Sequence, residues 1–212
     1  MHYLDPFIQF PPPSEADQDG LLAVGGDLSV ERLLLAYNSG IFPWYEDGQP
    51  ILWWSPDPRM VLLPEKLKVS KSLQKTLRQQ KFRVTFNSAF SEVIQNCAKI
   101  KRDGQGGTWI TNEMQRAYSA LHEMGHALSV EVWLEGELVG GLYGMDLPEK
   151  KIFCGESMFS LKSDASKVGF YHLIEALKKK DYNLIDCQMY TAHLESLGAE
   201  EMPRSDFLEY LM

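Results

Sequence analysis

The sequence predicts an α/β protein in which helices flank a mixed sheet, with a small extra unit at the N-terminus. Three observations support this prediction. The chain of 212 residues is 44% hydrophobic and 24% charged, the balance of a folded protein rather than a disordered one. From about residue 83 onward, helical and strand-like patterns of apolar residues alternate. The first 60 residues are instead rich in Pro, Gly and Trp, which indicates a separate subdomain.

Residues 1–62 are expected to form this small subdomain, packed onto a larger one that comprises residues 63–212. The small unit contains one predicted amphipathic helix. Ser29 is its N-cap and Gly40 ends it. Its buried face is expected to hold Leu33, Leu34 and Tyr37.

The larger subdomain begins with a strand and two helices. Arg83–Phe86 has the composition of a short strand. Ser88–Ala98 repeats apolar residues with a helical period. A second helix is predicted to open at a capping box formed by Asn112 and Gln115, and to stop at Gly125.

Three strands, a helix and a last strand follow. Leu128–Leu134 and Leu138–Met145 alternate like a hairpin, and Lys151–Phe159 is the next strand. Asp164–Lys180 has helical periodicity, and Asn183–Tyr190 is apolar enough for a central strand. The resulting order, β-α-α-β-β-β-α-β, resembles the acetyltransferase-type fold of the GNAT superfamily.

Composition also predicts a location in the cell. The start of the chain has no basic and apolar segment typical of a signal peptide. The longest stretch without a charge, Leu33–Tyr45, has 13 residues and is too short to span a bilayer. Three cysteines without close spacing argue against a disulfide framework. We therefore expect a cytoplasmic protein with no membrane partner.

The charge distribution points to a possible nucleic-acid contact. The whole chain has 21 basic and 29 acidic residues, which disfavours such a partner. Residues 66–83, however, hold seven basic residues and no acid. Lys71, Lys75 and Arg78 have the spacing of one helix face, so this segment is either a solvated surface or a contact for a phosphate backbone.

Two other chemistries are suggested by short motifs. His122-Glu123-Met124-Gly125-His126 matches the HExxH pattern of zinc hydrolases. Zinc binding requires both histidines on one continuous helix, whereas Gly125 is expected to end the helix between them. We therefore predict no metal site.

Acetyl-coenzyme A chemistry is the second alternative, suggested by the fold. Such enzymes typically bind the cofactor pyrophosphate at a Gly-rich turn before a helix. The corresponding segment, residues 159–165, contains no glycine and places Asp164 where an anion would bind. We therefore expect that no cofactor of this kind is used.

A third group of polar residues falls on two predicted strands. Because alternate strand residues share a face, Asp186 and Gln188 are expected to project to one side. The same rule places Cys154, Glu156 and Met158 together on their strand. An Asp–Gln unit can hold an incoming amine, or the pair can simply satisfy itself. Cys154 and Cys187 fit core thiols better than nucleophiles.

Several longer blocks closely resemble one family, the leucyl/phenylalanyl-tRNA–protein transferases. The similarity extends over nearly the whole chain and is far more specific than the short motifs. The blocks are Gly20-Leu21-Leu22-Ala23-Val24-Gly25-Gly26-Asp27-Leu28, Gly40-Ile41-Phe42-Pro43-Trp44, Trp53-Trp54-Ser55-Pro56-Asp57-Pro58-Arg59, Gly107-Thr108-Trp109-Ile110-Thr111, residues 153–160 and Ile185-Asp186-Cys187-Gln188.

The resemblance implies a reaction and its partners. The family transfers leucine or phenylalanine, and less well methionine, from aminoacyl-tRNA to the α-amine of proteins beginning with arginine or lysine. The product enters the N-degron pathway of protein degradation in bacteria. No metal or other cofactor is implied, because the aminoacyl ester is already activated. A monomer is expected. An RNA-binding module, an acetyltransferase and a zinc hydrolase are the alternatives.

The resemblance also implies site residues. Asp186, Gln188 and Glu156 match the reaction site, where Glu156 would face the acceptor's basic side chain. Gln188, polarised by Asp186, would either take a proton from the amine or, since an amide is a poor base, only orient it. The terminal ribose of the tRNA is a further candidate for carrying the proton. The basic block would bind the acceptor stem through Lys66, Lys68, Lys71, Lys75, Arg78 and Lys81. The pocket for the aminoacyl side chain and terminal adenosine would comprise Trp44, Trp109, Phe153, Met158 and Ile185, with Leu142 at a position where a family member has Met.

Overall fold

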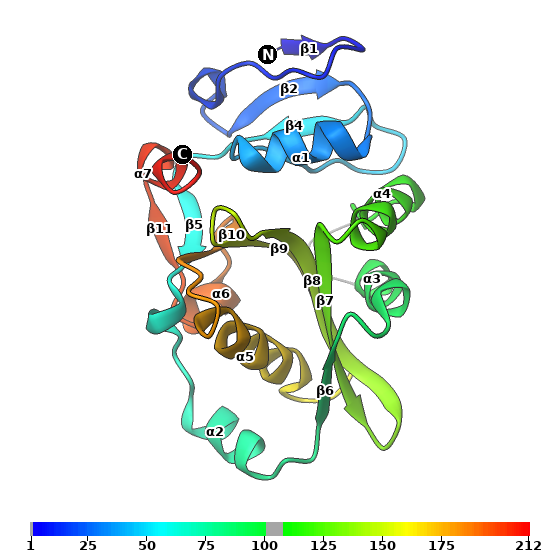
Figure 1. The fold of residues 1–212 in the computed structure, drawn as a ribbon, viewed down its shortest axis with the longest axis vertical. Coiled ribbons are helices and arrows are strands. Elements are labelled where there is room, and N and C mark those ends of the chain that lie inside the picture. The colour runs from blue at the N-terminus through cyan, green and yellow to red at the C-terminus, as the bar shows by residue number, and fades with distance from the viewer. Residues whose placement is uncertain (1, 101–107) are drawn as a thin grey trace.

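The computed structural model describes residues 2–100 and 108–212 and contains two β-sheets with helices around them (Figure 1). The small sheet has the strand order β1-β2-β4-β3. It is built from β1 (His2–Leu4), β2 (Leu21–Gly25), β3 (Phe42–Pro43) and β4 (Leu52–Trp54), with α1 (Val30–Asn38) beside it and a 3-10 turn at Pro13–Glu15.

Helix α1 begins and ends as the sequence predicts. The Ser29 hydroxyl accepts a hydrogen bond from the Arg32 backbone N–H at 3.4 Å, which caps the first turn. After the helix, Gly40 has a φ of +75°, and a Cβ there would lie 2.6 Å from the Leu208 side chain. Glycine therefore permits both the turn and the close approach of the C-terminal helix α7 (Arg204–Glu209).

The large sheet has the order β11-β5-β10-β9-β8-β7-β6. Its pairs are antiparallel except for the parallel pair β9–β10, so the sheet is mixed, as predicted. The strands are β5 (Arg59–Leu62), β6 (Arg83–Phe86), β7 (Ala127–Leu134), β8 (Glu137–Leu147), β9 (Ile152–Ser160), β10 (Leu184–Gln188) and β11 (Glu200–Met202).

Helices cover both faces of this sheet (Figure 1). From β6 to β10 the elements follow the predicted β-α-α-β-β-β-α-β order, with α3 and α4 on one face and α5 on the other. The remaining short helices lie in the connections. The bounds are α2 (Lys71–Arg78), α3 (Phe90–Lys99), α4 (Asn112–Glu123), α5 (Ala165–Lys178), α6 (Ala192–Ser196) and a 3-10 turn at Pro64–Lys66.

One cap differs from the prediction. Helix α4 is capped by Thr111, whose hydroxyl accepts from the Met114 backbone N–H at 3.2 Å, and not by Asn112. Gln115 instead donates its side-chain amide to the Ile110 carbonyl. The capping-box prediction was wrong by one residue, because Thr and Asn are both good caps and stand side by side.

A continuous hydrophobic cluster joins the two sheets. Leu22 and Trp53 of the small sheet belong to the same buried cluster as Val93 of α3, Leu121 of α4 and Tyr143 of β8. The proposed division at residue 62 stays a prediction, and β5, which ends there, pairs within the large sheet. In the described ranges, no helix combines the length and apolar character needed to cross a membrane.

Gly144 in β8 is expected to be indispensable for the packing of β8 on β9. A Cβ there would lie 2.2 Å from the Cys154 carbonyl oxygen and 2.5 Å from the Phe153 ring. Neither can move without disturbing the sheet. Gly144→Ala should lower the free energy of unfolding by about 2–3 kcal/mol, as measured by urea denaturation.

The matched control is Gly155→Ala, at the residue paired with Gly144 in β9. A Cβ at Gly155 meets its nearest neighbour at 3.8 Å, an ordinary contact. Its effect should stay within about 1 kcal/mol. Equal losses for the two variants would show that close approach at Gly144 is not the constraint.

Candidate active site

A cavity of about 490 Å³ opens where β9 and β10 separate. The two strands pair in parallel only as far as Cys154 and Asp186. Beyond that point side chains from both strands, from β3 and from α6 surround the space. The cavity brings together eight residues predicted from the sequence, namely Trp44, Trp109, Leu142, Phe153, Glu156, Met158, Ile185 and Gln188.

A bulge in β9 sets the direction of Glu156. In the pairing with β8, Tyr143 lies opposite Ser157 and Gly144 lies opposite Gly155, so Glu156 is the extra residue. The bulge reverses the alternation of side chains along β9.

The expectation that Cys154, Glu156 and Met158 share a face is therefore wrong. Cys154 packs in the cluster beneath α3 and α4, whereas Met158 packs in the cluster beneath α5. The Glu156 side chain points to the Cys154 side, where it meets α1 and α4.

A second bulge shapes the end of β10. Cys187 is the extra residue between Asp186 and Gln188 in the pairing with β5, and Gln188 has a φ of +66°. The predicted link between Asp186 and Gln188 exists, but the Gln188 backbone N–H makes it, at 2.9 Å. The Gln188 side-chain amide instead donates to Glu156 Oε1 at 2.9 Å.

Asp186 forms a buried ion pair with Arg59. The guanidinium donates from Nε at 2.8 Å and from Nη2 at 2.7 Å, one bond to each carboxylate oxygen. Both side chains are 1% exposed. Arg59 also donates to the Gly40 carbonyl at 3.2 Å. This two-point geometry holds Asp186 behind the cavity, and Asp186 does not line it.

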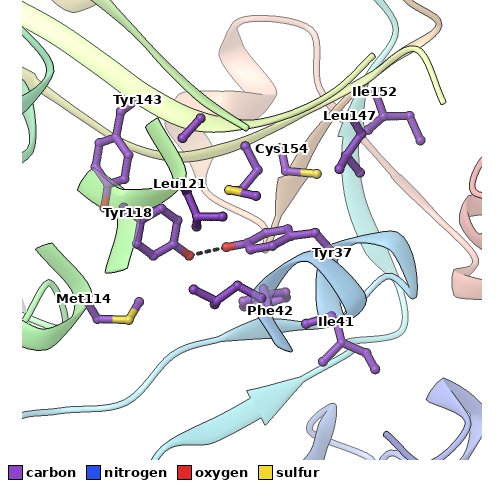
Figure 2. Packing of buried hydrophobic residues seen from close by; sticks show 14 of the residues in the cluster. Tyr37, Ile41, Phe42, Met114, Tyr118, Leu121, Tyr143, Leu147, Ile152 and Cys154 are labelled. Atoms are coloured by element: carbon purple, nitrogen blue, oxygen red, sulfur yellow. Dashed lines mark hydrogen bonds between the residues drawn. The ribbon is translucent and has the colours of Figure 1, made fainter. Parts of the chain in front are cut away.

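Glu156 has neutral hydrogen-bond donors instead of a cation. Tyr37 of α1 donates its hydroxyl to Oε1 at 2.7 Å, and Tyr118 of α4 donates to Oε2 at 3.1 Å. The two tyrosine hydroxyls also contact each other, as Figure 2 shows. With Gln188, the carboxyl group therefore has three donors from three different elements.

Burial raises the pKa of Glu156 to about 7. The hydroxyls of Tyr37 and Tyr118 and the amide of Gln188 act in the opposite direction, since they stabilise the carboxylate, and nearby Asp186 adds to the rise. A carboxyl group with such a pKa exchanges protons near neutrality, which is the property expected of an acid or base in a reaction.

The thiols of Cys154 and Cys187, in contrast, do not exchange protons near neutrality. Burial and the charge of Asp186 raise the pKa of both the Cys154 thiol and the Cys187 thiol. Both therefore stay protonated near neutrality and fit the predicted role of core thiols rather than nucleophiles.

The predicted basic helix is present as α2. Lys71, Lys75 and Arg78 line one shallow depression on its surface. Lys66 and Lys68 lie apart from it, beside an acidic surface, and Lys66 pairs with Glu200. Lys81 follows α2 and lies over the Phe82 ring at 4.9 Å.

The HExxH-like segment does not form a metal site. Helix α4 ends at Glu123, Gly125 has a φ of +81°, and β7 begins at Ala127, so the two histidines do not share a helix. His122 bonds the Ala127 carbonyl at 2.9 Å. Across the ranges 2–100 and 108–212, no three His, Cys, Asp or Glu residues are grouped to hold a metal.

Three members of the site, Arg59, Tyr37 and Tyr118, are not predicted by the sequence patterns. Tyr37 was predicted to be buried, but its contact with Glu156 was not predicted. Arg59 carried one usable signal, since residues 1–65 contain only two basic residues and an isolated arginine among aromatic and proline residues is unusual. Tyr118 stands in an ordinary helical pattern that gives no such signal.

The cavity has an apolar wall, which includes Trp44, Trp109 and Met158, and a polar wall, formed by Glu156 and Gln188. Such a cavity fits a group-transfer enzyme that recognises an apolar side chain and reacts at the polar groups beside it.

Comparison with known proteins identifies the family. The sequence model of the leucyl/phenylalanyl-tRNA protein transferases matches residues 61–212, and that of their N-terminal domain matches residues 26–57. A leucyl/phenylalanyl-tRNA–protein transferase of Christiangramia forsetii is 58% identical over 212 residues, 100% of each chain. One of Flavobacterium psychrophilum is 57% identical over 211 residues, 100% of this chain and 99% of the relative.

The chain belongs to the leucyl/phenylalanyl-tRNA–protein transferase family, whose members transfer Leu or Phe from aminoacyl-tRNA to protein N-termini. Among solved structures, a GCN5-related N-acetyltransferase from Kribbella flavida has 9% identity and a TM-score of 0.42, covering 85% of this chain and 63% of that one. This likeness is too distant to bear on function.

The buried ion pair should dominate the stability of the site. Asp186→Asn would leave the Arg59 guanidinium buried without a counter-charge, and the free energy of unfolding should fall by about 3–5 kcal/mol. Urea denaturation measures the change.

Glu200→Gln is the control, because it breaks a half-exposed pair with Lys66. That loss should be below about 1 kcal/mol. A similarly small loss for Asp186→Asn would contradict the role assigned to the ion pair.

Proposed function

We propose that the cavity holds the aminoacyl side chain and terminal adenosine of a charged tRNA. The enzyme then transfers leucine or phenylalanine, and methionine less well, to the α-amine of proteins that begin with arginine or lysine. The observation that supports this most strongly is the apolar cavity that opens directly onto the wall of Glu156 and Gln188.

The shape of the apolar wall supports the choice of amino acid. Its residues are aromatic or flexible, and Met158 and Leu142 can adapt to side chains of different length. A side chain branched at Cβ would be wide at the entrance, whereas Leu, Phe and Met are narrow there. Each misplaced methyl group costs about 1–3 kcal/mol, so selectivity is real but incomplete.

The polar wall supports the choice of reaction. The α-amine attacks the ester carbonyl, a peptide bond forms, and the ribose oxygen of the tRNA leaves. Gln188 orients the amine, since positioning alone supplies several kcal/mol. Asp186 fixes the Gln188 backbone, and Glu156 offers negative charge to the cationic end of the acceptor.

Helix α2 is proposed to contact the tRNA backbone. Lys71, Lys75 and Arg78 form a basic surface on a protein of formal net charge −8, and phosphate contacts position RNA without reading its bases. Lys81 is exposed and follows this surface, whereas Lys68 is exposed but lies apart from it, and Lys66 is partly neutralised by Glu200.

The cellular setting follows from this chemistry. The transferred residue becomes a destabilising N-terminus, which marks the protein as an N-degron for proteolysis. We propose that the enzyme acts as a monomer in the cytoplasm, where charged tRNA is found, and that it needs no cofactor.

The direct test is transfer of radiolabelled phenylalanine or leucine from charged tRNA onto a peptide that begins with arginine. Label should enter this peptide, and should not enter a matched peptide that begins with alanine. Labelled isoleucine should transfer at least about tenfold more slowly. Equal labelling of both peptides would refute the acceptor rule, and labelling of neither would refute the function.

A second test addresses helix α2. Lys71→Glu combined with Lys75→Glu should raise the KM for aminoacyl-tRNA about tenfold or more, and reduce the slope of log KM against log salt. A small donor such as an aminoacyl-adenosine should react normally.

The control is Lys179→Glu with Lys180→Glu, two exposed lysines after the end of α5. This pair reverses as much charge away from α2 and should leave the KM nearly unchanged. Equal losses in both double variants would point to net charge rather than to a site on α2.

A further inference from the structure

Glu156, Tyr37 and Tyr118 form a closed ring of hydrogen-bonding oxygens. Each of the three groups contacts the other two. Three contacts between oxygens require three protons, because every hydrogen bond needs one donor hydrogen. The two tyrosine hydroxyls supply two and can both donate to the Glu156 carboxylate, so the ring leaves room for one further proton on Glu156.

We propose that this ring is the proton acceptor of the transfer reaction, with Glu156 taking a proton from the α-ammonium group of the acceptor and Tyr37 and Tyr118 acting as its positioning residues. The proposal rests on the function proposed above, since it requires an amine acceptor. In this proposal Glu156 takes part in the chemical step, in addition to offering negative charge to the acceptor.

The other groups near the polar wall are poorer proton acceptors than Glu156. Gln188 is an amide and almost non-basic. Both oxygens of Asp186 are held by Arg59, and the side chain lies behind the cavity. Burial raises the pKa of the Tyr37 and Tyr118 hydroxyls well above the ordinary value, so neither ionises near neutrality.

His193 is the remaining competitor, because it also lines the cavity. Burial and the positive charge of Lys167 both lower the pKa of His193, so taking a proton is disfavoured there. Among the described residues, the main influences on the pKa of Glu156 include no cation, and the buried Arg59 is paired with Asp186.

Glu156 has room for one more partner. A carboxylate offers about four acceptor positions, and the structure uses three: two on Oε1, by Tyr37 and Gln188, and one on Oε2, by Tyr118. The residue lines the cavity although it is only 9% exposed. An ammonium group bound at the polar wall can therefore donate to Oε2.

The step balances without another reactant. An N–H bond of the ammonium group breaks, its electron pair stays on nitrogen, and an O–H bond forms on Glu156. The neutral amine attacks the ester carbon, and the carbon–ribose oxygen bond breaks. The ribose oxygen takes a second proton from the same nitrogen, and the ring later returns its proton to water.

The ring predicts how the reaction depends on pH. Glu156 must be ionised to accept a proton, so the rate should rise through the pKa of about 7. Tyr37, Tyr118 and Gln188 stabilise the carboxylate, whereas Asp186 on β10 opposes it. Cys154, which lies on β9 with Glu156, stays neutral. Removing one tyrosine hydroxyl therefore raises the pKa of Glu156. The acid limb of the pH–rate profile, in which the rate falls as Glu156 becomes protonated, then moves to higher pH.

The experiment compares kcat for transfer to an arginine peptide in wild type, Tyr37→Phe and Tyr118→Phe, between pH about 6 and about 8.5. Dividing the kcat of each variant by that of wild type at the same pH removes the effects common to both, namely ionisation of the peptide and hydrolysis of the ester. For each tyrosine variant the ratio should be near unity at high pH and about three- to tenfold lower at pH about 6. KM for aminoacyl-tRNA should not change.

Glu156→Gln tests the acceptor itself. Its rate should fall about tenfold or more at high pH and should lose the acid limb near neutrality. Adding Tyr37→Phe to Glu156→Gln should cause little further loss, because the hydroxyl acts through the carboxylate.

Tyr182→Phe is the matched control, since Tyr182 donates to the carboxylate of Asp146 at 2.6 Å outside the site. Its ratio to wild type should not depend on pH. Losses in Tyr37→Phe and Tyr118→Phe that are equally independent of pH would reduce the tyrosines to a structural role and overturn the proposal, as would a normal acid limb in Glu156→Gln. Loss of that limb in His193→Gln would assign the step to His193.

A measurement without substrate separates this inference from the proposed function. Titration of the Glu156 carboxyl carbon by NMR should give a pKa near 7, and a higher pKa in Tyr37→Phe. If wild type transfers nothing to arginine peptides, the proposed function fails while the titration still tests the ring. If wild type is active and the titration shows an ordinary carboxyl group, only the ring proposal fails.

Discussion

The ion pair between Arg59 and Asp186 is the interaction on which the rest of the site depends. Arg59 also donates to the Gly40 carbonyl, and its guanidinium lies 4.8 Å from the Phe42 ring centroid and 4.7 Å from that of Phe207. One buried cation thus joins the small sheet, the large sheet and the C-terminal helix. The desolvation of two charges is offset by the two hydrogen bonds between them, by the bond from Arg59 to the Gly40 carbonyl and by the bond from the Gln188 backbone N–H to Asp186.

The ion pair acts together with the two bulges. Asp186 is the last residue of β10 that pairs with β9, and the next residue, Cys187, is the bulge. On β9, Glu156 is the bulge two residues after the last pair. The strands therefore separate at the point where Arg59 fixes the Asp186 side chain through two hydrogen bonds. The cavity opens beyond that point, so its polar groups rest on a rigid support.

Local patterns predicted the elements well but not the site's inner contacts. Ser29, the Gly125 stop and the strand patterns at 128–134 and 138–145 are signals within a few residues, and the structure confirms the helix ends and the two strands, although β8 is buried on both faces. The pocket residues came from a family resemblance, and they do gather around one cavity. Simple alternation failed at Met158, because one inserted residue reverses every side chain after it.

Contacts between distant segments were beyond the reach of those patterns. Tyr37 and Tyr118 are 81 positions apart in the chain, and Arg59 and Asp186 are 127 apart. Nothing in the residues around Tyr118 distinguishes it from other apolar positions of an amphipathic helix. Only the packing of α1 against α4 shows that its hydroxyl, rather than its ring alone, has a partner.

The two carboxylates of the site show how surroundings assign roles. Asp186 and Glu156 lie on neighbouring strands and are buried to a similar degree. A guanidinium donates to both oxygens of Asp186, so this side chain is held in one position and serves as an anchor. Among the residues that the structure describes, those that donate to Glu156 are neutral. Burial therefore outweighs their stabilisation, the pKa rises towards neutrality, and the second carboxylate is left free to change its charge. An anchor and a titrating group, set side by side, are what the proposed transfer of an amine to an activated ester requires.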